Sequence, residues 1–138
     1  MGLVSEGYRK LATIMYLILS GSLSKDSILF WDEPETNMNP KMIQPMTEAL
    51  IELAKMGVQV FVTTHDYFVL QAFNLDSTYT NESRKKSKLE YKFISLNRNI
   101  DDSIECECAE DLSNITHNAI MEEFDALYDR EQGLIYGS

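Results

Sequence analysis

The sequence predicts an α/β fold built around a parallel sheet, and three observations lead to that prediction. Two short apolar runs, residues 28–31 and 58–62, are separated by a segment whose apolar residues recur at helical spacing. Each run ends abruptly in polar residues, which is typical of a strand buried on both faces of a parallel sheet. The strand–helix–strand order predicts two parallel strands joined by a right-handed crossover. With 138 residues, the chain suits one compact domain or part of a larger one.

Two helices are predicted around the first strand. The first helix is capped by Ser5 and runs to about Leu19. Its apolar face is formed by Leu11, Ile14, Met15, Leu17 and Ile18. The second helix begins at Asn39-Pro40, where a capping side chain precedes proline at the first helical position, and it ends at Gly57.

The rest of the chain adds a short helix, a strand pair and a closing helix. Asp66 or Thr64 can cap the short helix, whose apolar face includes Phe68, Val69 and Ala72. Residues 77–88 are polar and predicted to form a loop, and residues 91–96 and 104–108 are predicted to be two strands. The last helix is predicted from Asn114 to about Arg130, with Ile120, Phe124 and Leu127 facing inward.

Charge and composition exclude several kinds of surface for this segment. The formal net charge of −10 opposes phosphate groups, so we expect no dedicated nucleic-acid or anionic-membrane surface on it. No apolar run approaches the roughly 20 residues that span a bilayer, and no signal peptide is visible. Cys106 and Cys108 lie along one predicted strand, so neither a disulfide between them nor a zinc site is expected. The expected compartment is cytoplasmic.

Two carboxylates follow the first predicted strand. Asp32 and Glu33 come directly after its apolar run, and adjacent strand residues point to opposite sides. One carboxylate can therefore hold a hydrated magnesium ion, while the other orients and deprotonates an attacking water. The alternative interpretation is a solvated acidic loop that caps a helix.

Further polar groups follow the second strand and open the first helix. His65 comes after two threonines at the second strand end and can donate a hydrogen bond to a phosphate oxygen. Ser5 and Gly7 lie at a helix N-terminus, where free N–H groups attract an anion and glycine permits its close approach. Each signal is weak alone, and their order along the chain gives them weight.

In that order, residues 4–73 resemble the second half of the ABC-type ATPase head. The branch is the non-transporter one, which includes RecF, the structural-maintenance-of-chromosomes proteins and the overcoming-lysogenization-defect (OLD) ATPases. The segment 4–8 resembles the signature motif, 28–34 matches Walker B, 35–40 resembles the D-loop and 63–65 matches the switch-histidine loop. The resemblance implies a P-loop NTPase-like half-domain, with a parallel sheet core flanked by helices and a C-terminal strand pair and helix.

The resemblance also implies ATP as substrate and Mg²⁺ as cofactor. Asp32 would support the magnesium ion through water, Glu33 would be the general base and His65 would contact the γ-phosphate. In this family two heads sandwich two ATP molecules, so hydrolysis depends on a homodimer. Asn39 and its neighbours would cross the dimer interface, although the D-loop often carries aspartate at this position.

The signature segment departs from the family pattern. Ser5 and Gly7 would contact the γ-phosphate of nucleotide held by a second subunit. Glu6 replaces the first signature glycine, and Tyr8 stands where transporters usually have glutamine. These departures disfavour a second interpretation, that of an ABC transporter ATPase subunit.

A phosphate-binding loop is missing from the sequence. That loop, G-x-x-x-x-G-K-[ST], requires a Gly-Lys pair, and none exists here. We therefore expect residues 1–138 to be the C-terminal part of an ATPase domain whose Walker A half is absent, and to be inactive alone. Its partners would be the missing N-terminal half, a second head, and DNA or RNA reached through a parent protein, with no membrane. A non-catalytic partner-binding module is the alternative, but it would not need Asp32, Glu33 and His65.

Overall fold

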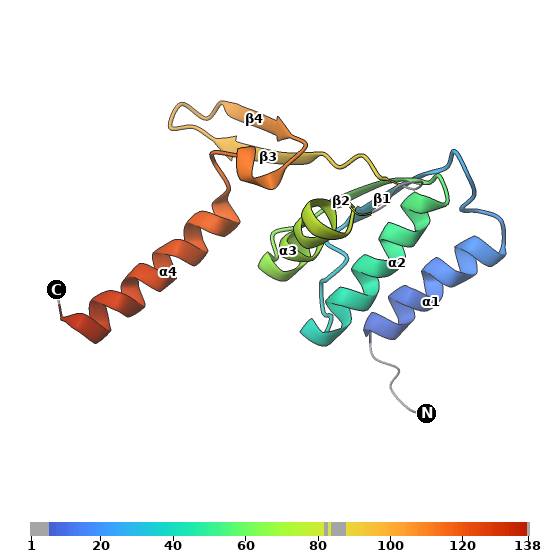
Figure 1. The fold of residues 1–138 in the computed structure, drawn as a ribbon, viewed down its shortest axis with the longest axis horizontal. Coiled ribbons are helices and arrows are strands. Elements are labelled where there is room, and N and C mark those ends of the chain that lie inside the picture. The colour runs from blue at the N-terminus through green and yellow to red at the C-terminus, as the bar shows by residue number, and fades with distance from the viewer. Residues whose placement is uncertain (1–5, 82, 84–87, 138) are drawn as a thin grey trace. The chain divides into compact units, whose positions relative to one another are not determined.

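The computed structural model describes residues 6–81, 83 and 88–137. It divides into two compact units, residues 1–89 and 90–138, which are described separately. The first unit contains two parallel strands and three helices, and the second contains an antiparallel strand pair and one helix (Figure 1). The predicted α/β architecture is therefore confirmed. Within the described residues, none of the helices combines the length and the apolar character that crossing a membrane requires.

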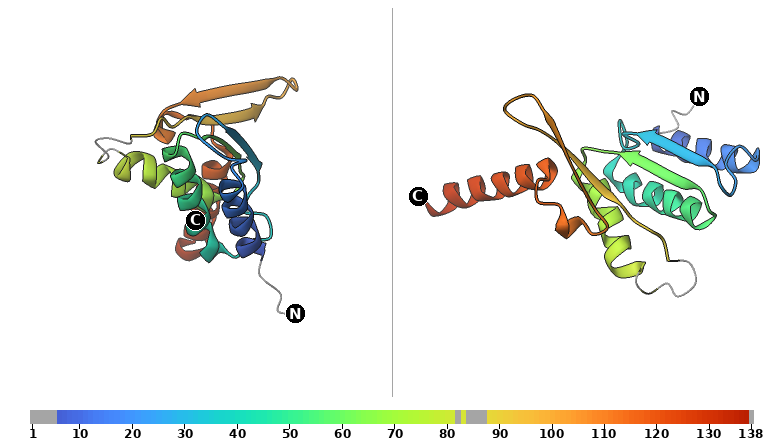
Figure 2. Two further views of the ribbon diagram at one scale, coloured as in Figure 1. Left: turned by 90° about the vertical axis from the view of Figure 1, so that its right-hand side faces the viewer. Right: turned by 90° about the horizontal axis from the view of Figure 1, so that it is seen from above.

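The sheet of the first unit is formed by β1 (Ile28–Asp32) and β2 (Gln59–Thr63), which pair in parallel. The crossover between them contains α2 (Ile43–Lys55), and α1 (Glu6–Leu19) and α3 (Tyr67–Leu75) precede and follow the strands. Figures 1 and 2 show α1 and α2 packed beneath the same face of this sheet.

One hydrophobic core holds the three helices against the sheet. Leu29, Trp31, Val60 and Val62 point from the strands into this core. Full burial of an apolar side chain contributes about 1.5–3 kcal/mol. The buried members of the core are Ile14, Leu23, Ile43, Met46, Leu50, Leu53, Val58 and Val69.

The opposite face of the sheet is exposed, so the prediction of strands buried on both faces is wrong for this chain. Phe30 is 74% exposed and Phe61 40%, and Ile28 is exposed beside them. The two phenylalanine rings stack with centroids 4.6 Å apart. The helices of this unit contribute to one core on one face, and the described residues of this unit leave the other face open.

The start of the second helix follows the sequence prediction with one difference. Asn39 caps the segment, and its side-chain oxygen accepts a hydrogen bond from the N–H of Lys41 at 3.0 Å. The capped segment is a single 3₁₀ turn, Pro40–Met42, and α2 begins only after it. Pro45 lies in the first turn of α2, where a missing N–H leaves no hydrogen bond unmade. Gly57, with φ of 92°, follows the helix end as predicted.

Two apolar side chains expected in the core are exposed. Met15 is 61% exposed on α1, because the buried stripe of that helix passes through Ile14 instead. Phe68 is 59% exposed on α3, where Val69 takes the core position. Phe68 lies beside a groove of about 440 Å³ between α2 and α3.

The predicted loop after α3 begins with further helix. A π-helical turn, Asp76–Thr80, continues directly from α3. The buried side chain of Asn81 then bonds both backbone groups of Leu89 at 2.8 Å. Residues 82 and 84–87 of this segment are outside the described residues.

The second unit begins with the hairpin of β3 (Phe93–Arg98) and β4 (Ile104–Ala109), which pair in antiparallel. The strand pair was predicted, and β3 lies two residues later than expected. Cys106 and Cys108 are exposed free thiols on β4.

The last helix, α4 (Ala119–Tyr136), starts and ends later than predicted. Asn114 closes a 3₁₀ turn instead, and Asn118 caps α4 by accepting hydrogen bonds from the first-turn backbone. Phe124 is 47% exposed and Leu127 59%, so the prediction that they face inward is wrong within this unit. In the described structure α4 has no buried residue, so its apolar side chains do not lie in a core.

Candidate functional site

The two predicted polar segments meet at one edge of the sheet. The parallel register pairs Asp32 with Thr63, so both strands end at the same level. We name residues 33–39, after β1, the acidic loop, and residues 64–66, after β2, the histidine loop. Glu33 and His65 are thereby brought together at the carboxyl ends of the two strands. Open α/β sheets generally bind their ligands at these ends.

Asp32 is held by a neighbour that the sequence did not suggest. The hydroxyl of Thr63 donates a hydrogen bond to the Asp32 carboxylate across the strand pair. Both residues are exposed at the end of the sheet. A carboxylate in this position is oriented by the threonine and still accessible from solvent.

Glu33 adopts an unusual backbone conformation. Its φ of 45° lies in the left-handed region, which costs a non-glycine residue about 1–2 kcal/mol. Its N–H donates to the carbonyl oxygen of Thr63 at 3.0 Å, which holds the chain to the sheet as it turns. Strained residues that persist in this way cluster at functional sites. The turn directs the Glu33 side chain toward the histidine loop. The Asp32 carboxylate instead remains hydrogen-bonded to Thr63, the last residue of β2.

The Glu33 carboxylate contacts the imidazole of His65. Glu33 Oε1 lies 2.9 Å from His65 Nδ1, and Glu33 Oε2 accepts a hydrogen bond from Thr36 Oγ1 at 3.4 Å. The side chains are 44% and 77% exposed, and exposed pairs of this kind are worth about 0–1 kcal/mol. The contact therefore contributes little to the free energy of folding. It does place a carboxylate and an imidazole next to each other, which are two groups that can take part in proton transfer.

A second contact joins the two loops and was missed by the sequence reasoning. Thr64 Oγ1 donates to Glu35 Oε1 at 2.6 Å in a partly buried position. The acidic loop is also anchored to α1, because Lys10 Nζ donates to the carbonyl oxygens of Pro34 and Thr36, each at 2.7 Å. The two hydroxyls directly before His65 were the available signal for such a contact.

The structure places the remaining predicted site residues as follows. Ser5 lies outside the described residues. Gly7 is buried in the first turn of α1, where an added Cβ would lie 3.1 Å from the Cβ of Met42 and 3.2 Å from the Cγ of Met38. This packing is a reason for glycine that is independent of nucleotide, and contact with nucleotide stays a prediction. Asn39 is exposed and acts as a cap, so its role at a dimer interface also stays a prediction.

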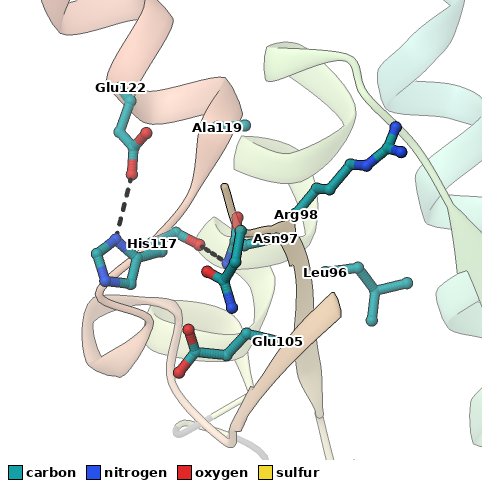
Figure 3. A pocket seen from close by; sticks show the side chains of 8 residues that line it. Leu96, Asn97, Arg98, Glu105, His117, Ala119 and Glu122 are labelled. Carbon is teal, nitrogen blue, oxygen red and sulfur yellow. Dashed lines mark hydrogen bonds and ion pairs between the residues drawn. The ribbon is translucent and has the colours of Figure 1, made fainter. Parts of the chain in front are cut away.

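A separate cavity of about 400 Å³ lies within the second unit. Figure 3 shows His117 turned toward Glu122, with its carbonyl oxygen accepting a hydrogen bond from Asn97. The His117 Nδ1 to Glu122 Oε1 distance is 3.8 Å, too long for a hydrogen bond. Glu105 and Arg98 also line the cavity, and Arg98 pairs with Asp102 instead of with these groups.

The hairpin of the second unit is tied to the segment before α4 by Glu107. Its carboxylate accepts hydrogen bonds from the backbone N–H of His117 and of Thr116, each at 2.9 Å, and from the Thr116 hydroxyl. The His117 bond is the largest cause that lowers the pKa of Glu107, followed by the Thr116 hydroxyl. This carboxylate is structural within the unit.

Comparison with known proteins assigns part of the chain to a family. Residues 1–71 match the protein family described as "AAA domain, putative AbiEii toxin, Type IV TA system". The chain belongs to this AAA-domain family. The matched residues of the AAA domain include the four segments whose sequences resemble ATPase motifs, residues 4–8, 28–34, 35–40 and 63–65. The fold of this chain is the P-loop NTPase-like α/β fold that the sequence predicted.

A curated relative is also similar to this AAA domain. Over 53 residues, 36% are identical to the protein named Old nuclease of Escherichia phage P2. The alignment covers 38% of this chain and 9% of that protein. The resemblance to OLD-like ATPases is therefore confirmed, while this chain spans only a small part of the length of that relative.

Proposed function

We propose that the chain is the C-terminal part of an ATP-hydrolysing head and that Glu33 is its general base. The observation that carries this proposal is the Glu33–His65 contact of 2.9 Å at the end of two parallel strands. A solvated acidic loop would not need a histidine paired with its carboxylate.

Each residue then has its own part in hydrolysis. Glu33 accepts a proton from water as the water oxygen attacks the γ-phosphorus, and the bond to the β–γ bridging oxygen breaks to give ADP and phosphate. His65 holds the Glu33 carboxylate through Nδ1. With both ring nitrogens protonated, it would also donate a hydrogen bond from Nε2 to a γ-phosphate oxygen. The exposure of both side chains leaves them open to a nucleotide that approaches the sheet edge.

The residues present fit a magnesium ion that is held largely through water. The Asp32 carboxylate and the Thr63 hydroxyl are hard oxygen ligands, exposed together at the strand ends. Mg²⁺ in nucleotide sites typically uses one or two carboxylates and takes its other ligands from water and phosphate. When bound, the ion would neutralise charge on the phosphates.

The head is proposed to act as a homodimer that sandwiches ATP. Ser5 and Gly7 would face the nucleotide of the second subunit, and Asn39 would lie at the interface. The missing N-terminal half, with the phosphate-binding loop, would be the other necessary partner. The exposed Phe30 and Phe61 supply an apolar sheet face on which further protein can pack.

The activity that the head powers is proposed to be directed at nucleic acid. The support is the similarity to the phage protein that is named Old nuclease. The chain itself carries a net charge of −10, so contact with DNA or RNA is assigned to other parts of a parent protein.

ATP turnover after restoration of an upstream half tests the proposal. The wild-type head is expected to hydrolyse ATP only with Mg²⁺, and Glu33→Gln is expected to bind ATP with turnover lowered about 100- to 10,000-fold. The matched control is Glu48→Gln, an exposed glutamate on α2 away from the strand ends. A head in which Glu33→Gln turns over ATP at the wild-type rate would show that Glu33 is not the base. A restored head that binds no ATP would favour the non-catalytic partner-binding module.

A further inference from the structure

Two contacts of different exposure join the acidic loop to the histidine loop. The Glu33–His65 pair is open to solvent, with side chains 44% and 77% exposed. The Thr64–Glu35 hydrogen bond, at 2.6 Å, is partly buried. Water and salt weaken an exposed pair, so the first contact alone cannot hold an imidazole in one orientation. The second contact is better protected from solvent and is therefore better placed to restrain the loop that carries His65.

The Thr64 hydroxyl both donates and accepts a hydrogen bond. It donates to Glu35 and accepts a hydrogen bond from the N–H of Asp66 at 3.0 Å. Asp66 is itself fixed, because its carboxylate caps α3 by accepting from Phe68 N at 2.8 Å and Val69 N at 3.0 Å. His65 thus lies between two residues whose positions are both determined by hydrogen bonds.

Glu35 is anchored as firmly on its own side. Lys10 holds the carbonyl oxygens of the residues before and after it, Pro34 and Thr36. Glu35 Oε2 is buried and has no hydrogen-bond partner among the described residues. The carboxylate oxygen Oε1 is committed to Thr64 in a partly buried position.

We propose that Glu35 and Thr64 are positioning residues, which hold His65 against Glu33 across the two strand-end loops. The inference rests on the proposed function, because a restrained Glu33–His65 pair matters only where that pair acts on a nucleotide. Neither residue touches the reacting atoms. They act by keeping the backbone of the histidine loop at a constant distance from the acidic loop.

The nitrogen resonances of the His65 ring in the full ¹⁵N-labelled chain test the restraint without any activity. Thr64→Val and Glu35→Ala are expected to move these resonances toward those of an unrestrained histidine and to speed amide exchange at His65 about tenfold. Thr64→Ser and Glu35→Gln keep the hydroxyl and an acceptor oxygen, so they are expected to retain the wild-type resonances. Thr47→Val is the matched control, because the buried Thr47 hydroxyl donates a hydrogen bond within α2, to Ile43 O at 2.9 Å.

The proposal is overturned if Thr64→Val folds, leaves the His65 resonances and exchange unchanged, and alters only overall stability, as Thr47→Val would. In a restored head, Thr64→Val is expected to lower kcat about 10- to 100-fold with KM unchanged, since small displacements of a reacting group slow chemistry by such factors. If the wild-type head does not hydrolyse ATP, the proposed function fails, while the resonances still decide whether Glu35 and Thr64 position His65.

Discussion

His65 Nδ1 lies 2.9 Å from Glu33 Oε1, although the two residues belong to loops that follow different strands. The contact exists because β1 and β2 are parallel and end at the same level. It also requires Glu33 to turn out of the strand with φ of 45°. Stability and chemistry therefore make opposite demands on this one residue.

Removing the Glu33 side chain is expected to relieve backbone strain. Glu33→Gly should leave the free energy of unfolding unchanged or raise it by up to about 1 kcal/mol, because glycine adopts positive φ without steric cost. Glu33→Val should lower it by about 1–3 kcal/mol, because a β-branched residue is poorly accommodated there. Urea denaturation followed by circular dichroism measures both. Equal stability of the two variants would contradict the strain.

Gly7 is expected to be required by packing as well as by any nucleotide. Gly7→Ala would place a methyl group 3.1 Å from the Cβ of Met42, which cannot move without the adjoining turn. We expect a loss of about 1–3 kcal/mol in the free energy of unfolding. Gly133→Ala is the matched control, since an added Cβ on α4 meets nothing within 4 Å, and it should raise helix stability by about 0.5–1 kcal/mol. A Gly7→Ala protein as stable as wild type would show that the turn yields.

The Asp66 cap is expected to hold the histidine loop at the start of α3. Asp66→Ala removes the acceptor for Phe68 N and Val69 N and should cost about 0.5–2 kcal/mol. Asp66→Ser restores an N-cap oxygen and should recover most of that loss. Hydrogen exchange of the first α3 amides, measured by NMR, reports the effect locally. Unchanged protection in Asp66→Ala would show that the cap is dispensable.

Acid is expected to loosen the segment before α4 through Glu107. Its pKa is lowered in the folded state by the hydrogen bonds from His117 and Thr116, so its contribution to stability is present above the unfolded pKa. That contribution should begin to disappear as pH falls below the ordinary glutamate value of about 4.3, and should be absent below the folded pKa. Amide exchange of residues 112–118 across this range measures it.

Glu107→Gln is the control for that titration, because the carboxyls of Asp101 and Asp111 also have lowered pKa values, from hydrogen bonds with Ser103 and Ser113. The variant should be looser than wild type at neutral pH and should lack the part of the acid response that Glu107 causes. An acid response identical in the two proteins would assign it to the aspartates.

Much of the fold could be predicted from local patterns. Local sequence was enough to predict the apolar runs of β1 and β2, the cap at Asn39 and the helix end at Gly57. Caps and glycine act over a single turn, so neighbouring residues suffice to recognise them. The order of the motifs likewise predicted that Asp32, Glu33 and His65 would share one sheet edge. The start of α4 was wrong because Asn114 and Asn118 are both good caps. The contacts that fix the segment between them, from Glu107 and Asn97 of the hairpin to His117, join residues distant in the sequence.

The sequence by itself determined the parallel strand pair, the family and the residues that carry the candidate chemistry, since periodicity and motif order are properties of the chain alone. Only the tertiary structure decided which partners those residues have. Thr63 beside Asp32, and Thr64 on Glu35, depend on the register of β1 against β2, and a register is set by pairing between distant segments. The exposure of Phe30 was likewise undecidable from the apolar run, because burial depends on which elements cover a face.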